Sequence, residues 1–144
     1  VLIYDEVNQI IGSIHAGWKG AFSGIIENTL DQIIKISQNA KISVAIGPCI
    51  GLNNYEVGEE FYAKFIQESK KNEYFFSSTK ENKFLFDLRK YVNSKFEKPE
   101  IKNVENIDFD TFSEDENFFS FRRSKKAGEK DYGRCISVIS LIND

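Results

Sequence analysis

Apolar residues occur in short runs, and the spacing within each run predicts an element of structure. Residues 1–4 and 9–15 form two apolar runs around a polar turn at 5–8, which predicts a buried β-hairpin. From Phe22 to Ile34 the apolar residues recur at helical spacing, which predicts an amphipathic helix of about five turns.

The middle of the chain continues this mixture of periods. The alternating run 41–46 predicts a strand, and the glycine- and proline-containing stretch 47–51 predicts a loop after it. Helical spacing predicts a helix over about 58–69, whereas no element is predicted for 70–83. Asp87 is a good N-cap for a third helix, whose inward residues are Leu88, Tyr91 and Val92.

The last third of the chain ends in apolar runs separated by charged loops. After a break at Pro99 and Glu100, a strand is expected over about 104–109, and a last strand over 134–142. Between them lie an acidic loop, an apolar run closed by paired arginines and a charged loop, at 110–117, 118–123 and 124–132. Strands mixed with helices indicate one domain of the α/β or α+β class.

Charge and composition exclude several classes of partner. The net charge of −3 argues against nucleic-acid binding through a basic surface, because no domain-wide excess of cations exists. No apolar run approaches the ~20 residues that span a bilayer, so no membrane partner is expected. Two cysteines, Cys49 and Cys135, do not make a disulfide framework, which favours a cytoplasmic protein.

The start of the sequence suggests a missing segment. The chain contains no methionine and begins inside a predicted strand. We therefore expect a C-terminal fragment of a longer protein, in which a site shared with the preceding segment is incomplete.

The stretch from Ile14 to Gly20 is the first candidate for a functional site. It contains the only histidine, His15, and the only tryptophan, Trp18, at the end of a predicted strand. Strand ends commonly carry catalytic and metal-binding groups, and imidazole can bind a metal or transfer protons near neutral pH. The alternative is a hydrogen-bonded histidine in the core.

Counting ligands limits the metal chemistry. A catalytic zinc site needs about three protein ligands and an open position. Cys49 lies in a loop and could approach His15, whereas Cys135 lies in a predicted strand and is expected in the core. If His15 binds a metal, the other ligands are expected upstream of Val1.

Cationic and aromatic residues suggest an anion and base site. Lys19, Arg122, Arg123 and Arg134 could form an anion pocket, because the guanidinium fork matches phosphate oxygens. Paired arginines are also common at solvated strand ends. The rings of Trp18, Phe119 and Phe121 could form a wall for a base, or could belong to the core. The glycines at 47–51 could let backbone approach a ligand, or could only form a turn, and no dinucleotide or phosphate-loop motif is present.

Three groups of residues match, in chain order, the signatures of one family. They are His15–Gly20 (HAGWKG); Ile46–Gly51 (IGPCIG) with Tyr55–Gly58 (YEVG); and Asp110–Phe112 (DTF), Phe118–Arg123 (FFSFRR) and Gly133–Arg134 (GR). On these motifs the sequence resembles the YfiH-like family, also called the laccase-domain or polyphenol oxidase family. The resemblance runs from His15 to the last predicted strand.

The resemblance implies a fold and a metal. The implied fold has α/β/β/α layers with mixed sheets and is related to bacterial toxin-type cysteine hydrolases. The implied cofactor is zinc, held by two histidines and one cysteine, of which His15 matches the last histidine. The other two ligands belong to segments that precede Val1, so Cys49 is not the equivalent of the family cysteine.

The resemblance also implies an activity. Members are regarded as purine nucleoside phosphorylases that act on adenosine, inosine, guanosine or methylthioadenosine and also deaminate adenosine, so the expected partners are a purine nucleoside and phosphate. His15 is then the catalytic and metal-binding residue. The candidates for binding the substrates are Trp18, Lys19, Phe119, Arg122 and Arg123. The sequence does not predict the preferred nucleoside or the oligomeric state.

Three other interpretations stay open. A copper-dependent phenol oxidase is the original assignment of the family, although multicopper sites need many histidines and this chain has one. A cysteine-dependent hydrolase is suggested by the fold relatives, with a nucleophile in the missing segment or at Cys49. A binding module without activity is possible for the fragment alone.

Overall fold

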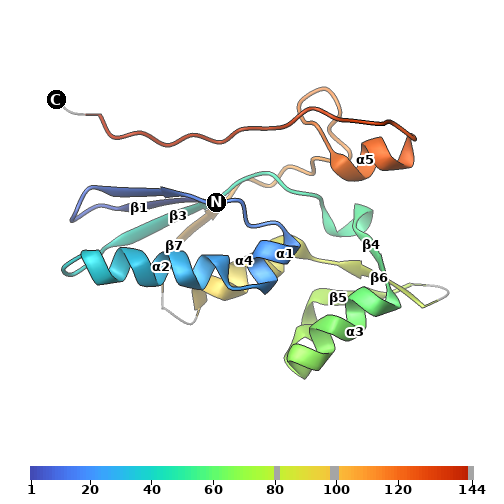
Figure 1. Cartoon of the computed structure of the whole chain (residues 1–144), viewed down its shortest axis with the longest axis horizontal. Coiled ribbons are helices and arrows are strands. Elements are labelled where there is room, and N and C mark those ends of the chain that lie inside the picture. The colour runs from blue at the N-terminus through green and yellow to red at the C-terminus, as the bar shows by residue number, and fades with distance from the viewer. Residues whose placement is uncertain (80–81, 98–100, 143–144) are drawn as a thin grey trace. The chain divides into compact units, whose positions relative to one another are not determined.

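The chain passes back and forth between two units of mixed strands and helices (Figure 1). The computed structural model describes residues 1–79, 82–97 and 101–142. Unit 1 comprises Val1–Pro48, Val92–Asp108 and Ile136–Asp144, and unit 2 comprises Cys49–Tyr91 and Phe109–Cys135. Neither unit is continuous in sequence, and the single domain expected from chain length stays a prediction.

Unit 1 contains a four-stranded sheet of mixed direction. Its strand order is β2 (Ile10–Ser13), β1 (Leu2–Asp5), β3 (Ile42–Ile46) and β7 (Asn103–Asn106). β1 pairs antiparallel with β2 and β3, and β3 pairs parallel with β7. The predicted hairpin and the strand at 41–46 are confirmed, and β7 ends at Asn106, short of the predicted end at residue 109.

The long helix predicted from Phe22 to Ile34 is wrong in one respect, because it is broken into two. α1 (Trp18–Phe22) and α2 (Ile25–Ile36) are separated at Ser23 and Gly24. Gly24 has φ 82°, in the left-handed region that glycine adopts without steric cost and that no helix interior contains. α2 buries Ile26, Leu30 and Ile33 and lies along one face of the sheet (Figure 1).

A buried carboxylate fixes the end of the hairpin in unit 1. The side chain of Asp5 is fully buried and accepts hydrogen bonds from the Ser37 hydroxyl (2.7 Å), the Asn8 amide (2.7 Å) and the Lys41 and Val7 N–H groups (3.0 and 3.2 Å). These bonds join the hairpin turn to the segment between α2 and β3. The polar residue in an apolar strand therefore has a structural role.

Unit 2 is built on a three-stranded antiparallel sheet and an aromatic core. The sheet order is β4 (Glu56–Gly58), β6 (Lys83–Phe86) and β5 (Phe76–Ser78). Phe61, Phe65, Phe76 and Phe86 meet with ring centroids 4.8–6.1 Å apart. Much of the phenylalanine content of the sequence is therefore used in this core.

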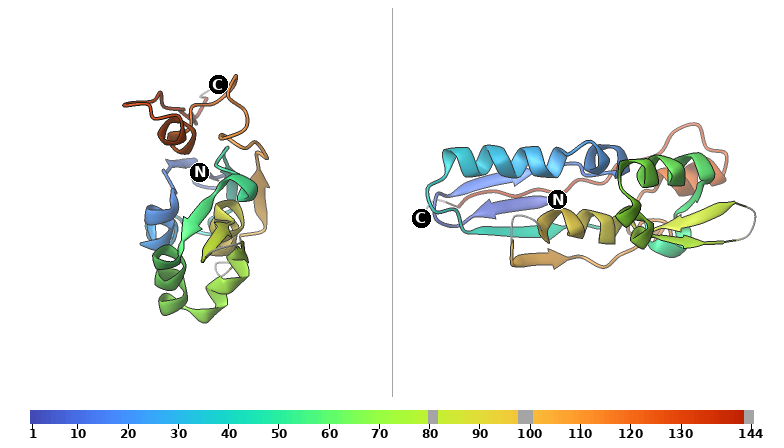
Figure 2. Two further views of the ribbon diagram at one scale, coloured as in Figure 1. Left: turned by 90° about the vertical axis from the view of Figure 1, so that its right-hand side faces the viewer. Right: turned by 90° about the horizontal axis from the view of Figure 1, so that it is seen from below.

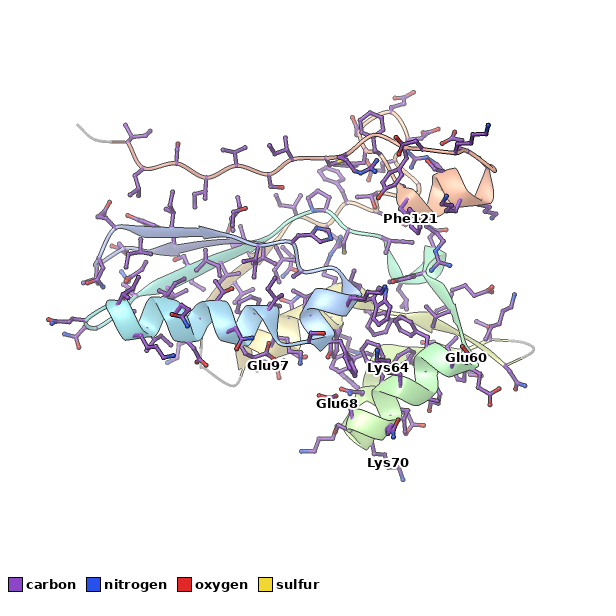
Figure 3. All side chains as sticks on the ribbon, in the orientation of Figure 1. Glu60, Lys64, Glu68, Lys70, Glu97 and Phe121 are labelled. Carbon is purple, nitrogen blue, oxygen red and sulfur yellow. The ribbon has the colours of Figure 1, made fainter. Side chains whose placement is uncertain are left out.

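The longer helix that lies wholly within unit 2, α3, agrees with the sequence pattern. α3 (Glu59–Glu68) confirms the helix predicted over 58–69, and its exposed residues Glu60, Lys64 and Glu68 follow one another along the helix (Figure 3). The short 3-10 helices η1 (Leu52–Asn54) and η2 (Lys70–Phe75) precede β4 and β5. The stretch without a prediction thus contains η2 and β5, and its residues 80–81 lie outside the described part of the chain.

α4 (Leu88–Glu97) confirms the third predicted helix, and the boundary between the units falls within it. Asp87 caps it, because the Lys90 N–H donates to Asp87 Oδ1 at 2.9 Å. Leu88, Tyr91 and Val92 are buried, as predicted. The break expected at Pro99 and Glu100 lies outside the described residues.

The expectations for the tail are corrected in two places. The paired arginines end no strand, because they belong to the helix α5 (Phe121–Lys126), which begins after the cap Ser120. The last strand predicted over 134–142 is not formed among the described residues, and Ile136, Val138 and Ile142 are 87%, 70% and 88% exposed. A strand needs a paired neighbour, which the alternation of apolar residues cannot supply.

The residues from Ile136 to Ile142 run as extended chain on the side of the unit 1 sheet opposite α2 (Figures 1 and 2). A cavity of about 260 Å³ lies between Tyr4, Ile11 and this segment. The α+β class is confirmed, with a sheet of mixed direction in unit 1 and an antiparallel sheet in unit 2. None of the described helices is long and apolar enough to cross a membrane.

Candidate functional site

His15 leaves the end of the β2 run and precedes α1, in unit 1. The backbone before it is fixed, because the Ile14 N–H donates to the Val1 carbonyl at 2.9 Å and the Val1 amino group donates to the Ile14 carbonyl at 2.9 Å. The His15 side chain is exposed. The interpretation as a buried core histidine is therefore wrong, and the imidazole is accessible to a ligand.

Two glycines of the HAGWKG motif give His15 its space. A Cβ atom at Gly17 would lie 3.0 Å from His15 Nε2, and one at Gly20 would lie 3.2 Å from the His15 carbonyl oxygen. Both distances are tighter than ordinary contacts, so a side chain at either position would push on the histidine. The two glycines therefore leave the imidazole of His15 the space that it needs in its exposed position.

Trp18 and Lys19 open α1 in the same unit. Trp18 is half-buried and Lys19 is exposed, with Lys19 Nζ 5.6 Å from the centroid of the indole ring. This distance allows a cation–π contact. Lys19 is thus accessible to an anion, and Trp18 retains exposed ring surface for a base.

Arg122 in unit 2 is held in a fixed direction. Its Nη1 donates to the Glu56 carbonyl at 3.0 Å, and its guanidinium carbon lies 5.1 Å from the ring centroid of Tyr55. Burial raises the pKa of Tyr55, and the nearby Arg122 charge opposes part of that rise. A half-buried guanidinium with a pre-set orientation suits recognition of phosphate oxygens.

Arg123 differs from its neighbour. Its Nη1 donates to the carbonyls of Thr111 and Phe112 at 2.6 and 2.9 Å, and its Nη2 donates to the carbonyl of Phe118. These three bonds brace the acidic loop against α5. Arg123 therefore stabilises the local fold of unit 2 through these bonds. Its phosphate-binding role stays a prediction without geometric support.

The aromatic residues of the closing motif are exposed. Phe119 is 59% exposed and Phe121 is 54% exposed. Figure 3 labels Phe121, which lies at the start of α5. Phe121 packs against Tyr132 with centroids 5.4 Å apart and planes at 61°. The guanidinium carbon of Arg134 lies 3.7 Å from the ring centroid of Tyr132, and its Nη2 lies 3.3 Å from Asp131 Oδ1. Arg134 therefore interacts within its own loop.

Asp110 joins two of the family-like motifs within unit 2, a role that the sequence reasoning missed. It accepts from the Gly51 and Phe112 N–H groups at 2.9 and 2.8 Å and from the side chains of Asn54 and Ser113 at 2.6 and 2.8 Å. Burial raises its pKa, but these bonds outweigh burial and the pKa is lowered. The sequence signal that could have indicated this role is the position of Asp110 at the start of the DTF motif.

Cys49 lacks the properties of an activated nucleophile. Cys49 is half-buried, and burial raises the pKa of its thiol, although the Arg89 charge opposes part of the rise. A raised pKa leaves less thiolate, which is the reactive form. Cys135 is exposed rather than in the core, so that expectation is wrong.

Within the described part of the chain the residues do not form a complete zinc site. Among the described residues, no group of three or more histidine, cysteine, aspartate or glutamate side chains could hold a metal ion. His15 offers one ligand where a catalytic zinc needs about three. Of the sequence-predicted site residues, His15, Trp18 and Lys19 lie in unit 1, and Phe119, Arg122 and Arg123 lie in unit 2.

The fold and these residues define an α+β protein with an accessible histidine after a strand, and with an oriented arginine in the unit that also carries exposed aromatic rings. The chain belongs to the family described as multi-copper polyphenol oxidoreductase laccase, which it matches over residues 1–142. The resemblance to the YfiH-like, laccase-domain family is confirmed.

Curated relatives carry a different name from the family description. The Rickettsia conorii protein named purine nucleoside phosphorylase RC0672 is 38% identical over 142 residues, which are 98% of this chain and 59% of that protein. The Escherichia coli purine nucleoside phosphorylase YfiH is 30% identical over 142 residues, 99% of this chain and 55% of that protein. The chain therefore spans little more than half the length of these relatives.

A solved structure confirms the fold. The crystal structure of the hypothetical protein YfiH from Bacillus licheniformis matches with a TM-score of 0.76 at 29% identity, covering 86% of this chain and 48% of that one. The YfiH-like fold expected from the motifs is thus present in this chain.

Proposed function

We propose that this chain supplies part of the active site of a purine nucleoside phosphorylase. The names of its curated relatives support the reaction class. The observation that carries the proposal is Arg122, a guanidinium fixed by the Glu56 carbonyl and Tyr55 in the same unit as the exposed ring of Phe119. Phosphate and a purine base are the ligands that these two groups suit.

Phosphorolysis transfers a ribosyl group from a base to phosphate. A phosphate oxygen forms a bond to C1′ of the sugar while the C1′–N bond to the base breaks, and the base leaves with the bonding electrons and gains a proton. Arg122 neutralises charge on phosphate and orients it. The role of Lys19 as a phosphate-binding cation stays a prediction from the sequence. Phe119 and Trp18 stack with the base.

His15 is proposed as one ligand of a zinc site that this chain does not complete. Its exposed imidazole after β2 supports the role, and its position in the HAGWKG motif matches the last ligand of the family. The other ligands would come from polypeptide outside these residues. Zinc would supply Lewis-acid chemistry when bound, and the binding roles of Arg122 and Phe119 do not depend on it.

Deamination of adenosine is proposed as a second activity, on the family resemblance alone. In this reaction the oxygen of a water molecule replaces the 6-amino group of adenosine, which gives inosine and releases ammonia without using phosphate. The cytoplasmic location belongs to the same proposal and is supported by two cysteines that are both free thiols.

A phenol oxidase is the second candidate function, favoured by the description of the family. Two observations would support it: copper that stays bound after treatment with a chelator, and oxygen consumption when a phenol is added. Purified protein that does both, and that releases no base from a nucleoside, would favour this candidate over the phosphorylase.

The role of Arg122 is tested in a chimera in which this chain replaces the matched part of the Rickettsia conorii relative. Arg122→Ala should raise the KM for phosphate about tenfold or more, the size of one hydrogen-bonded charge contact, with a smaller effect on the KM for inosine. Lys125→Ala, on the exposed side of the same helix, is the control and should leave both values unchanged. Unchanged phosphate dependence in Arg122→Ala would remove this residue from the phosphate site.

A further inference from the structure

The backbone around Phe119 is fixed on both sides. On one side the Phe118 carbonyl accepts from the Arg123 guanidinium. On the other side Ser120 is buried, and its hydroxyl accepts from the Arg123 N–H at 3.3 Å. The Phe119 ring nevertheless remains 59% exposed, so it projects to solvent from an anchored position.

The backbone of Gly133 lies directly against the Phe119 ring. A Cβ atom at Gly133 would lie 2.5 Å from Cδ1, Cε1 and Cζ of Phe119, closer than real Cβ atoms approach carbon. The ring therefore rests on the glycine backbone, and any side chain at position 133 would displace it. The chain continues beside Phe119 to Cys135, whose Sγ lies 3.9 Å from the Phe119 carbonyl oxygen.

An anchored ring with backbone on one side and solvent on the other is a stacking platform for a planar ligand. Bases stack on such rings with little regard to sequence, because every base has a π-face. Arg122 lies three residues further along the sequence in the same unit, and its guanidinium is held by the Glu56 carbonyl. It is therefore the cation nearest to Phe119 in the sequence. The pair suits a ligand with an aromatic part and an anionic partner.

We infer that Gly133 is a positioning residue, whose missing side chain seats the Phe119 ring for stacking on the purine base of the substrate. The inference rests on the proposed function, because the base is the ligand that the phosphorylase would place there. Gly133 would act only through Phe119 and would not touch the substrate.

The test measures equilibrium binding of inosine and of inorganic phosphate to the 144-residue chain by calorimetry. Gly133→Ala should weaken inosine binding about tenfold, the size of one stacking contact, and leave phosphate binding unchanged. Gly58→Ala is the matched control in the same unit, because a Cβ there meets no atom within 4 Å. A Gly133→Ala protein that binds inosine as well as the unaltered chain would overturn the inference.

A double-mutant cycle separates positioning from general loosening of the loop. Phe119→Leu should weaken inosine binding by itself, and adding Gly133→Ala to it should cause no further loss. An equal loss from Gly133→Ala in both backgrounds, or a loss of phosphate binding, would contradict the inference, as would an unaltered chain that binds no inosine. Failure of the proposed function is recognised separately, as inosine binding without phosphate-dependent turnover in the chimera.

Discussion

At the scale of single residues, two aspartates determine much of the local structure. Asp5 and Asp110 each accept four hydrogen bonds and each joins segments that are distant in sequence. Gly51 is coupled to the second of them, because a Cβ there would lie 2.6 Å from Asp110 Oδ2. The second glycine of the IGPCIG motif is thus required by packing within unit 2, because Asp110 occupies the space that a side chain would need.

Asp5 should make the stability of unit 1 depend on pH. Burial raises its pKa, but the bonds from Ser37, Lys41, Asn8 and Val7 outweigh burial and lower the pKa to about 2, from 3.8. Because the pKa is lower in the folded chain, the stabilisation is complete above about pH 4 and is lost as pH falls through 2.

Asp5→Asn should therefore lower the urea midpoint at pH 6 and flatten its fall between pH 4 and pH 2. Asp31→Asn, exposed on α2, is the control and should behave as the unaltered chain. Equal acid sensitivity in the unaltered and Asp5→Asn chains would show that another group causes it.

At the scale of elements, the sequence pattern was more successful in unit 1 than in unit 2, where it predicted neither α5 nor any strand of the β4, β6 and β5 sheet. The hairpin, β3, α3 and α4 are formed where apolar spacing and the Asp87 cap indicated. The pattern failed where one backbone position or one missing neighbour decides the outcome. Apolar spacing continues across Gly24, and only its φ of 82° separates α1 from α2.

The same limit applies to the tail and the site. Alternating apolar residues predicted a strand over 134–142, but strand formation needs hydrogen-bonded neighbours, and those residues are mostly exposed. The sequence named His15, Phe119 and Arg122 as candidate site residues, but it treated Arg122 and Arg123 alike. Their different partners depend on the fold of residues distant in sequence, which spacing alone does not encode.

Gly24 gives a direct test of the break between the two helices. Gly24→Ala should destabilise the chain by about 1 kcal/mol, because an L-residue in the left-handed region pays that cost. Gly24→Asn should lose less, since asparagine tolerates this conformation better. Urea denaturation measures both, and a Gly24→Ala chain of unchanged or higher stability would contradict the left-handed break.

At the scale of the whole molecule, the two units carry different parts of the candidate chemistry. Unit 1 presents His15, Trp18 and Lys19, and unit 2 presents Phe119 and Arg122. The chain covers 59% of the Rickettsia conorii relative, so the chemistry of that longer protein includes residues outside this sequence.

Zinc binding tests the role of His15. The 144-residue chain should lose zinc to a mild chelator, because one imidazole binds the metal weakly. The chimera should retain about one zinc per chain, and His15→Ala in the chimera should lose it. Metal analysis after dialysis checks both, and zinc retained by the His15→Ala chimera would exclude this residue as a ligand.

The most direct test of the phosphorylase proposal is the product balance of the chimera with inosine. The account predicts hypoxanthine and ribose 1-phosphate in equal amounts, formed only when phosphate is present. Hypoxanthine released with free ribose in the absence of phosphate, or no hypoxanthine under either condition, would contradict it.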